Sequence, residues 1–316
     1  MEKRFSVLLC EDMHEAGVNL LKEKCNVKFP ESLEEDDLVR EVADVDAVVI
    51  RARGAITRRV IEAAPRLKVI GRHGVGLDNI DLEAAREKGI RVVYTPLANA
   101  QSVAEHFVGL ALVLAKKINH AFEALKQGHW NARYEIRTTE LQGKTLGVVG
   151  FGNIGQCTAR ICHFGFEMPV LYFDVEPKED AEKLMNARRV SLEELFSQSD
   201  IISINLPLLP ETRHLIDRKF FTMMKPTAFV INMARGPVWK EEDLIEVLKE
   251  RRIAGAAADV FEQEPLPADH PLLKLDNFVG TPHMAAHTEE GMYRMSMVAE
   301  DVIAVLEGRE PRFPAV

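Results

Sequence analysis

Few cysteines, few aromatic side chains and no long apolar run occur in this sequence, and these shortages narrow what it can encode. The four cysteines among 316 residues form neither a CxxC pair nor a zinc-ligand spacing. Free thiols in a reducing cytosol are the simplest interpretation, so we expect a cytoplasmic protein. The first ten residues carry charges and no sustained apolar segment, so they do not resemble a secretory signal.

A membrane span and an excess of positive charge are also lacking. The longest apolar segment, Val103 to about Ala115, is interrupted by Glu105 and His106. It is shorter than the about 20 residues that cross a bilayer, so we expect no membrane partner. The formal net charge is −9 and no basic stripe occurs, which argues against nucleic-acid binding. An anionic substrate would need a local cationic site.

Short apolar strands alternate with amphipathic helical segments along nearly the whole chain. The predicted strands are residues 7–9, 47–50, 69–70, 92–94, 145–149, 170–173, 201–204, 228–231, 256–260 and 278–279. Such βαβ alternation predicts an α/β fold in which parallel sheets carry helices on both faces.

Several helix boundaries can also be predicted. Ser32–Glu35 and Ser191–Glu194 have capping-box spacing, and each is expected to open a helix. Residues 100 to about 128 are expected to form one long helix that links two units. Residues 289–307 are expected to form the final helix.

A glycine motif follows the predicted strand 145–149. Gly150, Gly152 and Gly155 fit G-x-G-x-x-G and precede a predicted helix that starts at Ile154. The three glycines permit a tight turn, close approach of a pyrophosphate, and close helix–strand packing. Asp174 ends the next strand, where an acid accepts hydrogen bonds from ribose hydroxyls. Because an acid there repels a 2′-phosphate, the pattern favours NAD over NADP.

Two further polar residues follow strands of the second half, where ligands of open α/β sheets bind. Arg235 follows the strand 228–231, and a guanidinium can bind a carboxylate and polarise a neighbouring carbonyl. His283 follows the strand 278–279, and its imidazole can take a hydroxyl proton and return it. A surface salt bridge and an ordinary hydrogen-bonded histidine are the simpler alternatives.

A carboxylate beside His283 would stabilise its imidazolium form and fix its tautomer. Glu264 is the first candidate for that carboxylate and Glu262 the second. His287 follows four residues after His283, but no third ligand is indicated, so we expect no metal.

Together these segments resemble the D-isomer-specific 2-hydroxyacid dehydrogenases. The matching stretches, in the order of that family, are residues 71–81, 102–105, 150–155, 200–210, 232–236, 259–265 and 281–283. The resemblance implies that Arg235 binds the substrate carboxylate, that His283 is the acid/base, and that Glu264 supports it.

The resemblance also implies two sets of binding positions. The cofactor-lining residues besides the three glycines would be Asn153, Ile154, Asp174, Leu206, Pro207, Met233 and Asp259. Gly74, Val75 and Gly76 would form a loop that meets substrate and nicotinamide, with Val75 counted among the cofactor contacts as well.

The implied architecture has two doubly wound domains. A Rossmann cofactor domain, residues 99–284, would be inserted into a flavodoxin-like substrate domain made of residues 1–98 and 285–316, with the active site in the cleft. Family members usually pair through their cofactor domains, so we expect a homodimer.

Within the family, the chain most resembles the catalytic part of D-3-phosphoglycerate dehydrogenases. Arg51, Arg53, Arg72 and Arg133 could meet a substrate phosphate, or could be solvated surface arginines. Ala52 stands where that subfamily often has serine, and the segment after His283 lacks a common glycine.

The expected function is therefore an NAD-dependent D-2-hydroxyacid dehydrogenase with D-3-phosphoglycerate as candidate substrate. One alternative is a glyoxylate/hydroxypyruvate or D-lactate-type reductase. An NAD-sensing corepressor and a bare dinucleotide-binding protein are further alternatives, but neither accounts for a full set of catalytic residues.

Overall fold

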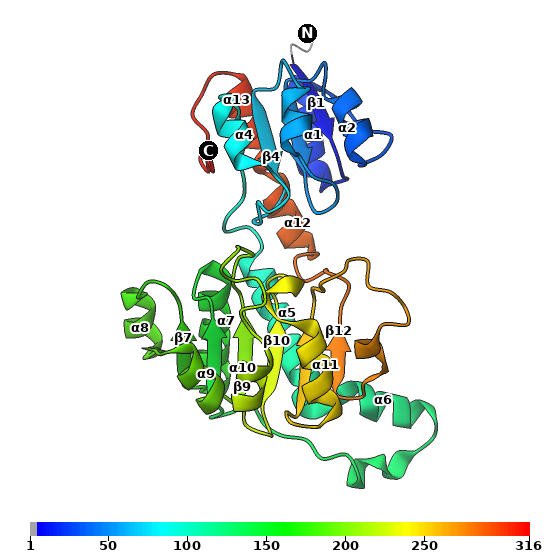
Figure 1. The fold of residues 1–316 in the computed structure, drawn as a ribbon, viewed down its shortest axis with the longest axis vertical. Coiled ribbons are helices and arrows are strands. Elements are labelled where there is room, and N and C mark those ends of the chain that lie inside the picture. The colour runs from blue at the N-terminus through cyan, green and yellow to red at the C-terminus, as the bar shows by residue number, and fades with distance from the viewer. Residues whose placement is uncertain (1–4) are drawn as a thin grey trace. The chain divides into compact units, whose positions relative to one another are not determined.

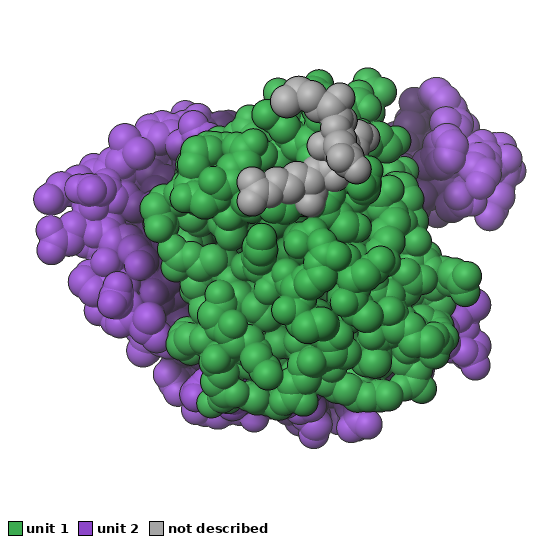
Figure 2. All heavy atoms as spheres, turned by 90° about the horizontal axis from the view of Figure 1, so that it is seen from above, with its two compact units in different colours: residues 1–99, 287–316 green, residues 100–286 purple. Residues whose placement is uncertain are grey.

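The computed structural model describes residues 5–316 (Figure 1). The chain divides into two compact units, which Figure 2 colours separately. Unit 1 contains the residues up to 99 together with 287–316, and unit 2 contains residues 100–286.

Unit 1 is built on a sheet of five parallel strands in the order β2-β1-β3-β4-β5. The strands are β1 Phe5–Leu9, β2 Cys25–Lys28, β3 Ala47–Ile50, β4 Val69–Arg72 and β5 Arg91–Val93. The helices are α1 Glu15–Lys24, α2 Glu35–Glu41, α3 Arg58–Glu62, α4 Leu82–Glu87, α12 Glu289–Ser296 and α13 Val298–Leu306. This strand order is that of flavodoxin-like folds.

Alternating side chains of these strands face two separate apolar cores, as the period of two in a strand requires. Val7 and Val49 pack with α1 and α13 on one face. Leu8 and Val48 pack with α2, α3 and α4 on the other. Because both faces are covered, the strands are continuous apolar runs, which is typical of parallel sheets.

Unit 2 is built on seven parallel strands in the order β12-β11-β10-β9-β6-β7-β8. The strands are β6 Leu146–Val149, β7 Val170–Phe173, β8 Arg188–Arg189, β9 Ile201–Ile204, β10 Phe229–Asn232, β11 Gly255–Ala258 and β12 Phe278–Gly280. The α-helices are α5 Ala100–Lys116, α6 Ile118–Lys126, α7 Asn153–Phe166, α8 Glu179–Met185, α9 Leu192–Gln198, α10 Arg218–Met223 and α11 Glu241–Lys249. The 3-10 helices are η1 Trp130–Tyr134, η2 Gly236–Val238 and η3 Pro271–Lys274.

The strand order of unit 2 reverses between β6 and β9, and α5 and α7 cover one face while α9, α10 and α11 cover the other. Ligands of open α/β sheets bind outside the carboxyl ends of strands at such a reversal. The predicted α/β class with two doubly wound parallel sheets is confirmed.

The prediction of one long helix over residues 100–128 is wrong. The helix breaks at Lys117, which has a left-handed φ of 49°, a conformation that ends α-helical hydrogen bonding. The break coincides with a change in burial, because α5 has a buried apolar face whereas α6 has no buried residue. Moreover, α5 and α6 both lie within unit 2, so the expected linking role is also wrong.

Two other helix predictions need correction. Helix α2 starts at Glu35 after Glu34, which makes no side-chain capping bond. Ser32 instead accepts a hydrogen bond from the Glu34 N–H at 3.1 Å and bonds Asp37, so it shapes the preceding turn. The expected final helix is two helices, α12 and α13, separated at Met297. By contrast, the cap predicted at Ser191 is confirmed, since its hydroxyl accepts from the Glu194 N–H at 3.1 Å.

Within residues 5–316, no helix combines the length and the apolar character that a membrane crossing needs.

Candidate active site

The glycine turn of unit 2 joins β6 to α7 at the strand reversal. Gly150 has a φ of 89°, and a Cβ there would lie 2.9 Å from the backbone of Asn205, which follows β9. A Cβ on Gly155 would overlap the carbonyl oxygen of Gly150, so α7 packs directly on the turn. At Gly152, a Cβ would point into open space, and this N-cap makes no side-chain capping bond. The turn therefore leaves N–H groups and room for a phosphate at the start of α7.

Asp174 is held beside this turn at the end of β7. Its carboxylate accepts the Phe151 N–H at 2.7 Å and the Glu176 N–H at 3.3 Å. Arg189, from β8, donates to the carbonyl oxygens of Asp174 and Val175 at 2.9 and 2.8 Å. A carboxylate has about four acceptor positions, so two remain for hydroxyl donors such as those of a ribose. The turn and this acid fit a dinucleotide.

The other residues predicted to line the cofactor follow the carboxyl ends of neighbouring strands in unit 2, with one exception. Asn153 and Ile154 open α7, Leu206 and Pro207 follow β9, Met233 follows β10 and Asp259 follows β11. Val75 lies in unit 1, in the loop after β4.

Glu264 and His283 form a hydrogen-bonded pair in unit 2. The distance from His283 Nδ1 to Glu264 Oε2 is 2.7 Å, and the other oxygen of Glu264 accepts the Phe261 N–H at 3.0 Å. Because a carboxylate only accepts, Nδ1 of His283 carries the hydrogen, and neutral His283 presents Nε2 as a proton acceptor. The side chains of His283 and Glu264 are 41% and 37% exposed, so the ring can be reached by a ligand.

The surroundings of Glu264 favour the ionised form of its carboxyl group. Burial acts to raise its pKa, but the hydrogen bonds from His283 and the Phe261 N–H act in the other direction. The charges of His283 and Arg235 also favour ionisation, and the pKa of Glu264 is lowered below its usual value. The charge of Arg235 thus acts on the Glu264 carboxylate.

The turn that carries Arg235 is fixed by Asn232, the last residue of β10. The Asn232 amide donates to the Arg235 carbonyl at 3.0 Å and accepts the Ala234 N–H at 2.9 Å. A Cβ on Gly236 would overlap the backbone of Phe261, so this turn packs against the segment that leads to Glu264. Asn232 was not among the predicted site residues, although a buried asparagine at a strand end is a signal that could have marked it.

Glu262, the competing candidate, faces away from this pair. Its carboxylate accepts the Glu241 N–H at 2.9 Å and lies 3.3 Å from Nε2 of His214. Of the two acids, Glu264 is the partner of His283.

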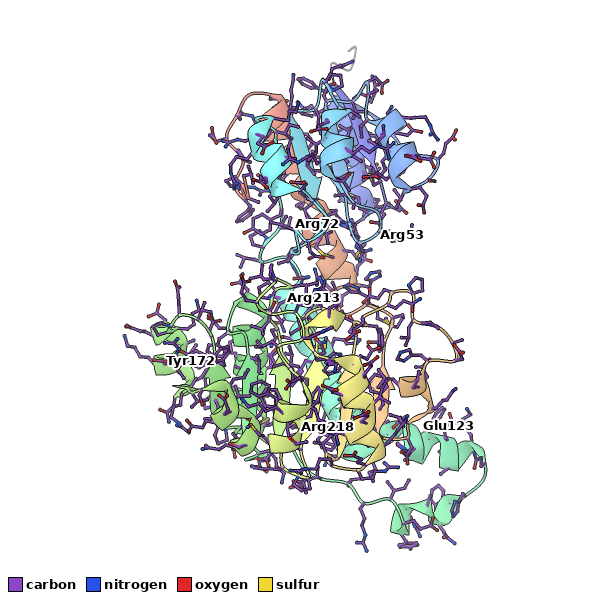
Figure 3. The ribbon with its side chains drawn as sticks, in the orientation of Figure 1. Arg53, Arg72, Glu123, Tyr172, Arg213 and Arg218 are labelled. Atoms are coloured by element: carbon purple, nitrogen blue, oxygen red, sulfur yellow. The ribbon has the colours of Figure 1, made fainter. Side chains whose placement is uncertain are left out.

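In unit 1, the guanidinium of Arg72 closes the glycine loop that follows β4. Arg72 is buried, and it donates to the carbonyl oxygens of Gly76 and His73, the latter at 3.0 Å. Gly74 has a φ of 140°, and a Cβ there would lie 3.2 Å from an Arg72 nitrogen. Arg72 thus shapes the loop that contains Gly74, Val75 and Gly76. Figure 3 labels Arg72, the last residue of β4, together with Arg53, which lies in the loop after β3.

Arg51, Arg53 and His73 lie in the same unit. Burial lowers the pKa of Arg51, against the charge of Glu11, and its guanidinium contacts the ring of His287. Arg53 is exposed and lies 3.4 Å from Glu11. His73 is 2% exposed, and burial together with the charges of Arg51 and Arg72 lowers its pKa to about 3. His73 is therefore neutral near pH 7.

Arg133, the fourth arginine considered for a phosphate, belongs to an exposed aromatic group in unit 2. Its guanidinium carbon lies 4.6 Å from the ring centre of Tyr134 and 5.6 Å from that of Trp130. Stacking on these rings accounts for its position within this chain.

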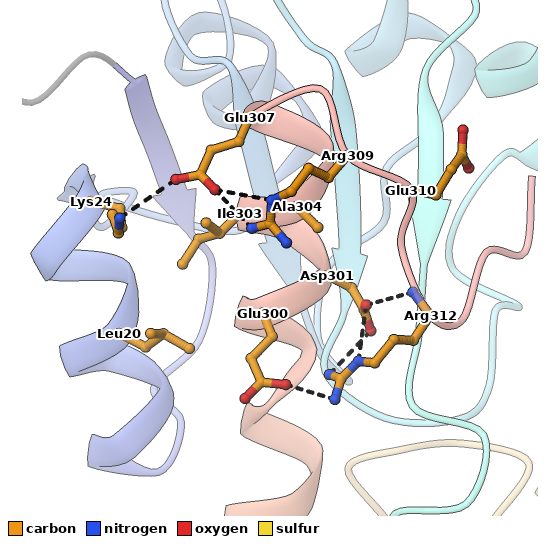
Figure 4. Close-up of a pocket in the computed structure, with 10 residues that line it drawn as sticks. All are labelled: Leu20, Lys24, Glu300, Asp301, Ile303, Ala304, Glu307, Arg309, Glu310 and Arg312. Atoms are coloured by element: carbon orange, nitrogen blue, oxygen red, sulfur yellow. Dashed lines mark hydrogen bonds and ion pairs between the residues drawn. The ribbon is translucent and has the colours of Figure 1, made fainter.

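A hollow of about 360 Å³ in unit 1 lies away from these residues, between α1, α13 and the chain that follows α13 (Figure 4). Its charges pair with one another: Glu307 with Lys24 at 3.6 Å and Arg309 at 2.7 Å, and Arg312 with Asp301 at 3.2 Å. Since these charges are already satisfied, the hollow is not a candidate active site.

Among residues 5–316, no group of three histidine, cysteine or acidic side chains is arranged to hold a metal ion.

Comparison with known families gives a consistent result. Residues 108–285 match the model of the D-isomer specific 2-hydroxyacid dehydrogenase, NAD binding domain. A glyoxylate reductase of Thermofilum pendens is 43% identical, over 94% of this chain and 90% of that protein. A D-3-phosphoglycerate dehydrogenase of Methanocaldococcus jannaschii is 44% identical over 96% of this chain, but the chain spans only 57% of that relative.

A solved structure agrees with these relatives. The crystal structure of D-lactate dehydrogenase from Aquifex aeolicus, complexed with NAD and lactic acid, covers 96% of this chain with a TM-score of 0.87 and 30% identity. The matches confirm the predicted family and the predicted NAD cofactor. The chain belongs to the D-isomer specific 2-hydroxyacid dehydrogenase family and contains its NAD-binding domain.

Proposed function

We propose that this chain is an NAD-dependent dehydrogenase that interconverts a small D-2-hydroxy acid and its 2-keto acid. The observation that carries the proposal is the His283–Glu264 pair, 2.7 Å apart, in the same unit as the glycine turn and Asp174. The oxidation of an alcohol requires an acid/base group and a dinucleotide site, and this unit contains candidates for both.

The roles follow from the chemistry of each side chain. The glycine turn and Asp174 hold NAD, which supplies the hydride acceptor or donor. His283 takes the hydroxyl proton at Nε2 during oxidation and returns it during reduction. Glu264 stabilises the imidazolium that forms, and Arg235 binds the substrate carboxylate through paired N–H groups.

We further propose that unit 2 corresponds to the cofactor domain, residues 99–284, and unit 1 to the substrate domain, residues 1–98 and 285–316. The family model supports the first assignment, because it covers residues 108–285. Arg51 supports the second, because it directly follows β3 at the carboxyl edge of the sheet in unit 1.

For the substrate we propose a 2-hydroxy acid that carries a terminal phosphate, as D-3-phosphoglycerate does. Arg51 and Arg53 follow β3 and supply positive charge there, although Arg53 lies 3.4 Å from Glu11 and Arg51 contacts the ring of His287. The occupied guanidinium of Arg72 favours the alternative, a reductase of glyoxylate or hydroxypyruvate, because it removes one of the arginines considered for the phosphate.

A panel of 2-keto acids tests both statements. NADH oxidation is measured with phosphohydroxypyruvate, hydroxypyruvate, glyoxylate and pyruvate, in the wild type and in Arg51→Met. The phosphate proposal expects the highest kcat/KM with phosphohydroxypyruvate, and a selective loss of that preference in Arg51→Met. Equal or faster turnover of hydroxypyruvate supports the alternative, and no turnover with any member contradicts the dehydrogenase.

We propose a homodimer that pairs through α6 and η1. The arm patch, five large apolar side chains that are at least 50% exposed, consists of Ile118, Phe122, Leu125, Trp130 and Tyr134. Helix α6 has no buried residue, and a helix of that length is marginal in water without packing. A second copy would cover this patch. Sedimentation should show a dimer that Phe122→Glu dissociates, and a monomeric wild type would contradict it.

We infer a cytoplasmic location from the cysteines. All four are unpaired, and burial raises the pKa of the Cys10 and Cys162 thiols to about 12. Cell fractionation that recovers the protein with a secreted or membrane fraction would contradict this inference.

A further inference from the structure

A hydrogen-bonded chain connects α5 to the segment that carries His283. Nε2 of His106, on α5, lies 2.9 Å from Oγ1 of Thr281, which directly follows β12. The Thr281 hydroxyl lies 2.6 Å from a carboxylate oxygen of Asp259, which follows β11. The chain thus joins three elements of unit 2 at its carboxyl edge.

Asp259 in turn fixes the segment 281–285. Its carboxylate accepts the Met284 N–H at 2.9 Å and the Ala285 N–H at 2.8 Å, and its carbonyl accepts the His283 N–H at 2.8 Å. Asp259 is only 2% exposed, and its bonds hold both sides of His283, whose φ is 50°. A non-glycine residue in that conformation needs support from its surroundings.

The direction of each hydrogen bond follows from what the groups can donate. The Asp259 carboxylate only accepts hydrogen bonds, so the Thr281 hydroxyl donates its single hydrogen to Asp259. The Thr281 oxygen must then accept from His106, which requires a hydrogen on Nε2 of that ring. The chain is therefore ordered as His106 Nε2–H to Thr281 O–H to Asp259.

We propose that His106 and Thr281 are positioning residues that orient the Asp259 carboxylate and, through it, the acid/base His283. Neither needs to touch substrate or cofactor for this role. Three of about four acceptor positions of the carboxylate are used, so the role is compatible with a cofactor contact by Asp259. The kinetic part of this inference rests on the proposed dehydrogenase activity, whereas the hydrogen-bond order does not.

The first test compares Thr281→Val, which removes the hydroxyl at nearly constant volume, with Thr281→Ser, which keeps it. Because small displacements of a catalytic group can lower rates about 100-fold, we expect kcat to fall at least about 10-fold in Thr281→Val. The KM for NADH should change less than about 3-fold, and Thr281→Ser should restore kcat. A Thr281→Val enzyme with wild-type kcat, or a Thr281→Ser enzyme as impaired as it, would overturn the proposal.

The second comparison uses His106→Leu and His106→Gln, since a glutamine amide can donate where Nε2–H does. His106→Leu should lower kcat, and His106→Gln should recover most of it. Because both residues act through Asp259, His106→Leu should add little to the defect of Thr281→Val. Additive defects would show that His106 and Thr281 act separately, and would contradict the proposed hydrogen-bonded series from His106 through Thr281 to Asp259.

A third readout needs neither cofactor nor turnover. In the protein without NAD, histidine NMR should find Nε2 of His106 protonated, and a deprotonated Nε2 overturns the proposal. Amide exchange of Met284 and Ala285 should be at least about 10-fold faster in Thr281→Val than in Thr281→Ser. If this readout holds while no 2-hydroxy acid is turned over, only the proposed function fails.

Discussion

The first strand–helix turn of each unit offers a direct comparison, because the two sheets share a doubly wound parallel plan. In unit 1 the turn from β1 to α1 contains no glycine, and His14 caps the helix by accepting the Ala16 N–H at 3.1 Å. In unit 2 the turn from β6 to α7 is lined by glycines, and the N-cap Gly152 provides no side-chain cap. The same architecture presents a helix N-terminus twice, but only one is left open for a phosphate.

A second pair of features points the same way. In unit 1 the N–H groups of Ala52 and Arg53 donate to the Glu11 carboxylate at 2.6 and 3.0 Å, so an internal acid already occupies them. In unit 2 the carboxylate of Asp174 accepts one N–H of the glycine turn and keeps acceptor positions available. Function thus depends on which polar groups a fold leaves unsatisfied, and the fold alone does not decide it.

The largest expected effect concerns the acid/base of unit 2. His283→Ala should lower kcat by about 10²- to 10⁴-fold, the usual contribution of a positioned general acid/base. NADH binding, followed by fluorescence titration, should stay near wild type because the glycine turn is unchanged. His163→Ala is the matched control, since that ring bonds the Met168 carbonyl at 3.0 Å and packs against Phe164, apart from the Glu264–His283 pair. Turnover retained in His283→Ala would refute the assigned role.

The same comparison shows what the sequence could predict. The glycine turn, Asp174 and the positions of most strands along the chain follow from local patterns of spacing and apolarity. The pairing of Glu264 and His283 needed the resemblance, because spacing alone left Glu262 open. His106, Thr281 and Asn232 could not be assigned, because their roles come from hydrogen bonds between elements distant in the chain. The break at Lys117 was missed because the change in burial that accompanies it, from α5 to α6, is a property of packing.

The next effect concerns the packing of α7 on its turn. Gly155→Ala places a Cβ against the carbonyl oxygen of Gly150, and overpacking of this kind costs about 1–3 kcal/mol. Thermal unfolding should show that loss, and NADH affinity should fall with it. Gly165→Ala on the same helix is the matched control, because a Cβ there meets no atom within 4 Å. Equal behaviour of the two variants would contradict the close packing inferred for the turn.

A smaller effect tests the choice of cofactor. Asp174→Ser removes the carboxylate that would repel a 2′-phosphate, while Arg189 remains at the Asp174 and Val175 carbonyls. We expect the ratio of kcat/KM with NADPH to that with NADH to rise about 10- to 100-fold, as loss of one or two charged hydrogen bonds allows. In the double variant Asp174→Ser/Arg189→Met, this ratio should rise less than in Asp174→Ser alone. An unchanged ratio in Asp174→Ser would mean that another group selects NAD.

The smallest effect belongs to the capped helix of unit 1. His14→Ala leaves the Ala16 N–H without its acceptor, and loss of a helix cap costs about 1 kcal/mol. His14→Asn should recover much of this stability, because an asparagine oxygen can accept the same N–H, although the 3.0 Å contact of His14 with Glu289 would be lost. Neither variant should alter NADH affinity, because the helix start that His14 closes is not the one that receives the dinucleotide. A change in NADH affinity together with unchanged stability would contradict the conclusion that the β6–α7 turn, and not the β1–α1 turn, receives the dinucleotide.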